Sequence, residues 1–180
     1  MTVVSGAPSP ELRSRAILEI LDGSRLLSLW TVGRDGSAHI NTAFFAFDPA
    51  FTLFVFTPPS TEHARNLVGN PSAAATVFDS HQAPESRQGL QLFGEMRMLD
   101  GAEAVGAHAR FTSRFADLRE TAPRYDDVVE NLSSRFFALV PRRIKVFDEV
   151  LLHHGDFVEV LINEAAPPTR SSVADRKSVV

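Results

Sequence analysis

Short apolar runs separated by turn-forming residues are the feature of this sequence that most restricts its fold. We expect strands over 26–32, 38–47, 51–56, 73–78, 90–99, 136–140, 144–147 and 151–160. Two of the connectors, Gly33-Arg34-Asp35-Gly36 and Asp48-Pro49-Ala50, are short turns and indicate an antiparallel meander. Many short strands with few helical patterns are typical of a small antiparallel barrel and argue against alternating parallel units.

Helical patterns are confined to a few segments. Ser9-Pro10-Glu11 is a helix-start signal, because the hydroxyl caps free amides and proline suits the first turn. Asp100 and Glu103 have the spacing of a capping box. Gly94, inside an expected strand, predicts a bulge or a close backbone approach. We expect helices over about 10–21, 61–69, 102–115 and 125–134.

Length, charge and composition further restrict the class of protein to which this chain can belong. With 180 residues we expect one domain over 1–165, followed by a mobile C-terminal tail over 166–180. A net charge of -4 argues against nucleic-acid binding, and the lack of cysteine excludes thiol chemistry. No segment has the length of a membrane span, and the N-terminal segment has no signal-peptide pattern, so we expect a cytoplasmic protein.

Generic catalytic signatures are missing from the sequence. There is no Gly-x-Ser-x-Gly elbow, no phosphate loop ending in Gly-Lys-Ser/Thr and no His-Glu-x-x-His. His153 and His154 are adjacent, and neighbouring side chains of a strand point to opposite faces, so we expect no metal site. No catalytic residue is identified at this level.

Two segments have binding chemistry. The expected helix start at 60–67 offers free amides to an anion, and Thr61, His63 and Arg65 add a hydroxyl and cationic donors. The run Ile40 to Phe47 combines small, polar and aromatic residues that a flat heterocycle would contact. Each segment also has a purely structural interpretation, as a capped surface helix and as core phenylalanines.

Taken in order, these segments resemble the pyridoxamine 5'-phosphate oxidase-like family of flavin-binding split barrels. The resemblance covers most of 26–148 and rests on Asn41 to Ala46, Phe56-Thr57, Thr61-Glu62-His63, Asn70-Pro71, GLQLFGEMRML and LVPRRIKVFD. It implies a mainly β, antiparallel split β-barrel with a few short helices that forms a homodimer. It also implies one FMN at each of two equivalent sites in the subunit interface. The implied cofactor-binding residues are Asn41, Thr42, Ala43, Phe44, Phe56, Thr57, Thr61, His63 and, from across the interface, Gln91.

The chain differs from the family pattern at several positions where other members have an arginine or a lysine. Asn41 replaces an arginine, Ala46 replaces the lysine that closes the first flavin strand, and Glu62-His63 replaces an Arg-Lys pair. The family's flavin-contacting glutamine falls on Gly89, with Gln88 and Gln91 nearby. Oxidation of vitamin B6 phosphates is therefore not expected, and the pattern is closer to small uncharacterised bacterial members of the family.

The resemblance thus implies an FMN-dependent oxidoreductase acting on an unknown small molecule. The alternative is a non-catalytic binding module, a sensor or carrier for flavin, haem or deazaflavin on the same fold, and a third option is a structural dimer with an empty cleft. Fold alone does not distinguish these functions.

Overall fold

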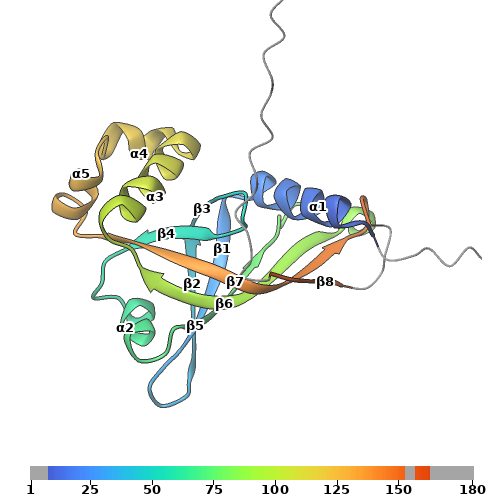
Figure 1. The fold of residues 1–180 in the computed structure, drawn as a ribbon, viewed down its shortest axis with the longest axis horizontal. Coiled ribbons are helices and arrows are strands. Elements are labelled where there is room, and N and C mark those ends of the chain that lie inside the picture. The colour runs from blue at the N-terminus through green and yellow to red at the C-terminus, as the bar shows by residue number, and fades with distance from the viewer. Residues whose placement is uncertain (1–7, 153–156, 163–180) are drawn as a thin grey trace, which may run out of the picture.

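The computed structural model describes residues 8–152 and 157–162, so the expected tail over 166–180 and the His153-His154 pair lie outside the described residues. One eight-stranded antiparallel sheet has the order β2-β1-β5-β6-β7-β4-β3, with β8 also paired to β7 (Figure 1). The strands are β1 (Leu26–Val32), β2 (Ala38–Phe44), β3 (Ala46–Phe47), β4 (Leu53–Thr57), β5 (Ser72–Val77), β6 (Gln88–Met98), β7 (Arg135–Asp148) and β8 (Val158–Leu161).

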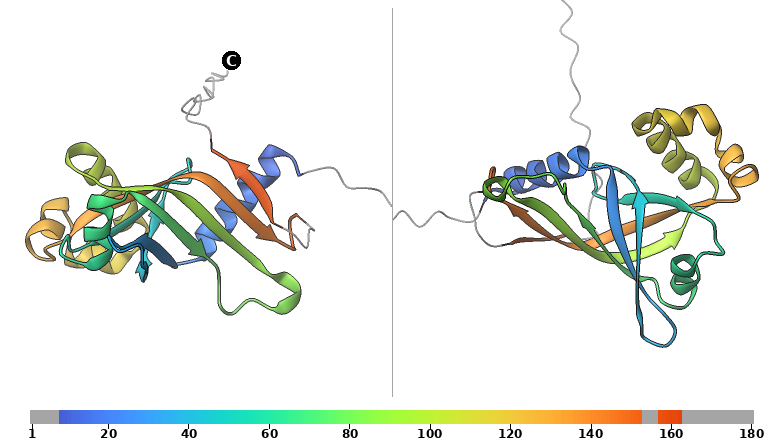
Figure 2. Two further views of the ribbon diagram at one scale, coloured as in Figure 1. Left: turned by 90° about the horizontal axis from the view of Figure 1, so that it is seen from below. Right: turned by 180° about the vertical axis from the view of Figure 1, so that it is seen from behind.

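The two ends of this sheet are consecutive pieces of one chain segment. β2 pairs with β1, β3 pairs with β4, and only Phe45 separates β2 from β3. The sheet therefore curls so that its two edges approach each other at Phe45, which gives a half-barrel (Figure 2). The mainly antiparallel β architecture with a few helices is the one predicted.

Helices cover the sheet in three places. They are α1 (Pro10–Gly23), α2 (Glu62–Gly69), α3 (Gly101–Arg114), α4 (Ala116–Thr121) and α5 (Tyr125–Glu130), with a 3-10 turn at Pro84–Ser86. α1 contacts β6 and β7, and α2 contacts the hairpin of β1 and β2. The α3–α5 cluster lies at one end of the sheet (Figures 1 and 2). Within the described residues, no helix has the length and apolar character needed to span a membrane.

Two apolar cores hold these layers together. The first lies between α1 and the inner face of the sheet and includes Ile17, Leu21, Leu29, Leu53, Val55, Leu90, Leu92 and Ile144. The second joins the α3–α5 cluster to β3, β4 and β7 and includes Ala46, Phe54, Phe111, Phe115, Leu118 and Phe136. Consecutive residues of β4 pack in different cores, because consecutive side chains of a strand point to opposite faces of the sheet.

Several sequence predictions are confirmed and several are wrong in detail. Ser9 caps α1 by accepting a hydrogen bond from Leu12 N at 3.2 Å, and the β6–β7 register shifts at Phe93/Gly94, where a bulge was predicted. The capping box is wrong, because Asp100 makes no side-chain cap and Glu103 pairs with Arg97 instead.

The predicted strand boundaries also need correction. Strand 38–47 is interrupted at Phe45, and strands 136–140 and 144–147 are one continuous strand, β7. Pro141 is tolerated inside β7 because it lies at the register shift, where strand hydrogen bonding is already irregular. The expected strand over 151–160 begins only at Val158 in the described residues, and α4 was not predicted.

Candidate functional site

Three polar side chains converge where β4 leads into α2. The Nε2 atom of His63 lies 2.9 Å from Thr57 Oγ1 and 3.0 Å from Thr61 Oγ1. The two hydroxyl oxygens are 3.4 Å apart, and Thr61 Oγ1 also donates to the carbonyl of Pro58 at 2.9 Å. Thr57 ends β4, and a turn that begins with Pro58 brings the chain to Thr61, the N-cap of α2. We call Thr57, Thr61 and His63 the hydroxyl–imidazole cluster.

The first turn of α2 adds backbone donors to this cluster. The side chain of Thr61 makes no capping bond, and the first amides of a helix have no intrahelical acceptor. The helix is fixed by Asn66, whose buried amide donates to Thr31 Oγ1 of β1 at 3.2 Å. These amides and the positive end of the helix dipole favour an anion here.

A second histidine, His39, lies beside His63 and Glu62. The ring of His39, on β2, stacks on that of His63 with 5.9 Å between centroids, and His39 Nδ1 lies 3.4 Å from the Glu62 carboxylate. Burial lowers the pKa of His63, His39 lowers it further, and Glu62 opposes the shift. His63 is thus a buried base beside two hydroxyl groups.

The residues predicted on β2 divide between two faces. Asn41 and Ala43 are half-buried and share the face of His39, whereas Thr42 and Phe44 are exposed on the outer face of the sheet, opposite Ser28 and Leu26 of β1. His39 connects β2 to α2, so the Asn41 face of β2 and the hydroxyl–imidazole cluster belong to the same region of the fold.

Phe56 lies differently from its neighbour Thr57. Its ring packs in the second core, with centroids 5.2 Å from Phe111 and 5.6 Å from Phe136. Its side chain therefore supports the α3–α5 cluster, and only its backbone lies beside the hydroxyl–imidazole cluster. The predicted cofactor contact of Phe56 stays a prediction.

Gln91 lies in a separate pocket on the outer face. This pocket, of about 380 Å³, is formed by β5, β6 and the end of β7, and is lined by Gln91, Thr76, Phe78, Gly89, Phe147 and Phe157 among others. Gln91 pairs with Lys145 of β7 and Thr57 pairs with Arg135, ten residues away along the same strand. At about 3.3 Å per residue, the path along β7 between the two pairing positions is about 33 Å long.

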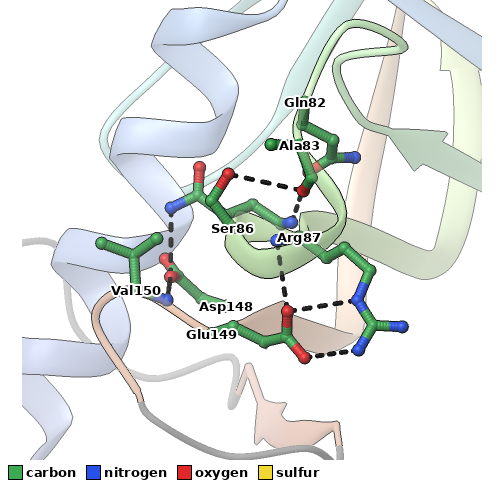
Figure 3. Close-up of polar contacts among 8 residues, drawn as sticks. Gln82, Ala83, Ser86, Arg87, Asp148, Glu149 and Val150 are labelled. Carbon is green, nitrogen blue, oxygen red and sulfur yellow. Dashed lines mark hydrogen bonds and ion pairs between the residues drawn. The ribbon is translucent and has the colours of Figure 1, made fainter.

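One ion pair and several hydrogen bonds join the start of β6 to the end of β7 and the turn after it (Figure 3). Arg87 donates to both carboxylate oxygens of Glu149, at 3.1 and 2.6 Å, and its guanidinium lies 5.5 Å from the Phe147 ring centroid. The buried Asp148 accepts hydrogen bonds from Gln88 Nε2 and from the amides of Val150 and Leu151. Gln88 is thereby tied to the turn after β7.

Sequence reasoning missed the part played by His39. The only available signal was strand alternation, which puts His39 on the same face as Asn41 and Ala43. The stacking on His63 depends on how α2 packs against the hairpin, which no local pattern specifies. Within residues 8–152 and 157–162 there is no group of three metal-ligating side chains that could hold an ion.

The structure is thus an antiparallel β half-barrel in which the first turn of α2 lies beside the edge strand β2. The family described as pyridoxamine 5'-phosphate oxidase matches residues 14–152 of this chain. The chain belongs to that family, as its motifs predicted.

Relatives from enteric bacteria are similar over part of the chain. UPF0306 protein YhbP of Salmonella paratyphi A is 31% identical over 87 residues, which cover 48% of this chain and 59% of that protein. UPF0306 protein YhbP of Escherichia coli O157:H7 is 27% identical over 123 residues, which cover 68% of this chain and 76% of that protein. The chain thus spans less than two thirds of the Salmonella relative.

Solved structures with lower identity share the fold. The conserved protein Rv2991 of Mycobacterium tuberculosis has a TM-score of 0.66 at 19% identity, over 86% of this chain and 93% of that one. A heme binding protein of Mycobacterium smegmatis scores 0.66 at 16% identity, over 87% and 60%. HutZ, a heme storage protein of Vibrio cholerae, scores 0.61 at 23% identity, over 74% and 92%.

Proposed function

We propose that this protein binds FMN and acts as a flavin-dependent oxidoreductase on a small molecule. The observation that carries the proposal is the convergence of Thr57, Thr61 and His63 on the first turn of α2. Hydroxyl, imidazole and free amide donors together suit a phosphate monoester. Asn41 and Ala43 share the adjacent face of β2, where the ribityl chain and ring of the flavin would lie.

The charge of the cluster fits a phosphate less strongly than a lysine and arginine pair would. Glu62 follows the N-cap directly, and its carboxylate lies 3.4 Å from Nδ1 of His39. Protonation of His63 would give its ring a positive charge and make both ring nitrogens donors. We therefore expect FMN to bind, with an affinity that depends on protonation.

The proposed site also requires a second copy of the chain. Gln91 is about 33 Å from the hydroxyl–imidazole cluster along β7, so one chain does not bring both to the same flavin. The outer face exposes Leu26, Trp30, Ile40 and Phe44 on β1 and β2, an apolar area of the kind that marks interaction sites. A homodimer is therefore part of the proposal, because only a second copy would offer Gln91 to the flavin held by the first.

Bound FMN would supply the hydride or electron transfer, which no side chain of this protein provides. The chain's own part is to hold the phosphate at Thr57, Thr61 and His63 and to orient the flavin along β2. No residue is assigned as a catalytic acid or base.

A second candidate function is a non-catalytic module that binds haem, flavin or deazaflavin. The observation that favours it is the fold shared with a heme binding protein and a heme storage protein. The losses of charge at Asn41, Ala46 and Glu62 are also compatible with a site that has no substrate to hold.

Absorbance titrations with riboflavin, FMN and hemin separate these functions. The proposal predicts saturable FMN binding near one equivalent per chain, tighter than riboflavin, with a change in the fluorescence of Trp30, the only tryptophan. Steady oxidation of a nicotinamide nucleotide by the FMN-loaded protein would support the oxidoreductase. Hemin binding without flavin binding would support the binding module instead and reject FMN.

A further inference from the structure

Two strands, β4 and β8, share one edge of β7. The other edge pairs with β6, whereas β4 pairs with residues 135–139 and β8 with residues 143–146. Both run antiparallel to β7, so the end of β8 points toward the start of β4 (Figure 1). The amide of Ile162 donates to the carbonyl of Arg142 at 2.9 Å, and Leu53 already faces Leu139. The chain that follows Ile162 therefore has to leave this edge of the sheet.

A groove in two parts begins at this junction. The first part, of about 340 Å³, is lined by Ile162, Thr52 and Val140 among others. The second part, of about 280 Å³, shares Thr52, Arg97 and Val140 with the first and lies between α3 and the sheet. We call the two parts together the α3 groove. Because β8 runs toward the end of β7 that packs against α3, it leads from the first part to the second.

The α3 groove suits a narrow, uncharged segment. Phe54, Ala138 and Val140 line its second part from the sheet, and Ala107 lines it from α3. Val140 is 42% exposed although it lies in the middle of the longest strand.

The charged side chains of the groove have partners. Arg97 binds the Glu103 carboxylate through two hydrogen bonds, and Arg142 pairs with Glu95 at 2.8 Å. The arginines at the rim therefore do not require an anionic occupant.

We propose that the segment Asn163-Glu164-Ala165-Ala166-Pro167-Pro168 of this chain lies in the α3 groove and covers Val140. The segment follows Ile162 directly. Six extended residues span about 20 Å, more than the about 13 Å along β7 from Arg142 to Ala138. The single charge of the segment, Glu164, falls at its start, beside the exposed Arg142. The proposal is independent of the flavin site.

The composition of the segment supports this occupant. Two alanines present small apolar side chains to the groove. Pro167 and Pro168 have no amide N–H. Strand carbonyls point along the sheet toward the neighbouring strands, so a segment that crosses the face of a sheet finds few acceptors there. Two prolines can therefore cover this face without leaving a buried donor unpaired.

Paired cysteines test the proposal in the intact chain, which has no cysteine of its own. A short bismaleimide reagent should link Val140→Cys to Ala166→Cys within one chain. The rate should be at least tenfold higher than for Val68→Cys with Ala166→Cys, because Val68 is exposed on α2, outside the α3 groove. Thr52→Cys with Ala166→Cys is a second pair at the groove and should also react fast. Mass spectrometry identifies the linked peptides.

The contribution of the prolines has its own variant. Replacing both Pro167 and Pro168 by serine adds two amide donors and should lower the rate for the Val140 pair severalfold. Ser171→Ala with Ser172→Ala is the matched control outside the proposed segment and should leave that rate unchanged.

Three results would overturn the proposal. Equal rates for the Val140 and Val68 pairs, or no linked product at either groove position, would show that the segment is not held in the α3 groove. Faster linking of the Val68 pair would place the segment along α2. A covalent dimer in place of an internally linked chain would assign the groove to the segment of a second copy.

Discussion

At the scale of single residues, His63 is the side chain on which the proposed phosphate contact depends most. His63→Ala removes the imidazole that lies within 3.0 Å of both threonine hydroxyls. Loss of a hydrogen bond to a charged group costs about 1.5–3 kcal/mol, so FMN should bind about 10- to 100-fold more weakly. Riboflavin has no phosphate, and its Kd should not change. Equal losses for both ligands would show that the phosphate lies elsewhere, and the exposed His81→Ala is the control.

The lowered pKa of His63 also predicts how stability varies with pH. Burial and the neighbouring His39 hold this pKa below the usual 6.5. Between the folded and unfolded pKa values the unfolded chain binds more protons, so the free energy of unfolding falls as pH drops below about 6.5. It should level off below the folded pKa. Urea denaturation at several pH values should give a flatter profile for His63→Gln, and parallel profiles would contradict the assignment.

At the scale of elements, the second core fixes the α3–α5 cluster to the sheet. Phe111 of α3 is buried and packs against Phe56, Phe115 and Phe136. Phe111→Ala should destabilise the protein by about 3–5 kcal/mol, the usual range for a buried phenylalanine. Val105→Ala, at an exposed position of the same helix, should cost far less. Equal midpoints for the two variants in chemical denaturation would mean that the cluster does not depend on this core.

The register shift between β6 and β7, where Arg142 of β7 has no partner on β6, gives a second test at this scale. A Cβ atom at Gly94 would lie 2.0 Å from the carbonyl oxygen of Val140 and 2.8 Å from Pro141 Cα, both backbone atoms of β7. Gly94→Ala should therefore destabilise by about 1–3 kcal/mol or more. Gly106→Ala is the matched control, since open space surrounds that position of α3 and alanine should stabilise the helix by about 0.5–1 kcal/mol. Thermal unfolding of the two variants distinguishes these outcomes.

Local sequence patterns predicted the structure well where a single residue determines the local backbone conformation. Ser9 and Gly94 are such residues, and the cap and the register shift are both found where they were predicted. Asp100 and Glu103 had the spacing of a capping box, but Arg97 of β6 takes the Glu103 carboxylate with bonds of 2.6 and 2.8 Å. Arg97, six residues before Glu103 on the preceding strand, thus takes the carboxylate in place of the local cap, and the spacing of Asp100 and Glu103 does not reveal this partner.

At the scale of the whole molecule, the fold and half of the candidate site were accessible from the sequence. The order of motifs predicted a split barrel and placed Thr57, Thr61 and His63 in one group, because they are close in sequence. The stacking of His39 on His63 and the α3 groove were not predicted, because both arise from packing between distant segments.

The last prediction concerns the apolar outer face of β1 and β2. If two copies of the chain associate through this face, the proposed flavin site can include Gln91 of the second copy. On β1 and β2, Leu26 lies opposite Phe44 and Trp30 opposite Ile40, and Trp30 and Phe44 are 40% and 53% exposed. Burying these side chains against a second copy would remove a large apolar area from water, whereas a charge placed among them would oppose association. Trp30→Glu should therefore convert a dimer into a monomer in light scattering.

The same variant connects assembly to ligand binding. The hydroxyl–imidazole cluster and Gln91 are about 33 Å apart along β7, so a monomer offers the flavin only one of the two groups. Trp30→Glu should weaken FMN binding at a protein concentration where the wild type is dimeric, and raising the concentration should restore part of it. Val105→Glu, at an exposed position of α3, should change neither property. If the wild-type protein is monomeric and still binds FMN tightly, the flavin site is not shared between two copies. The flavin contacts would then be confined to β2, β4 and α2.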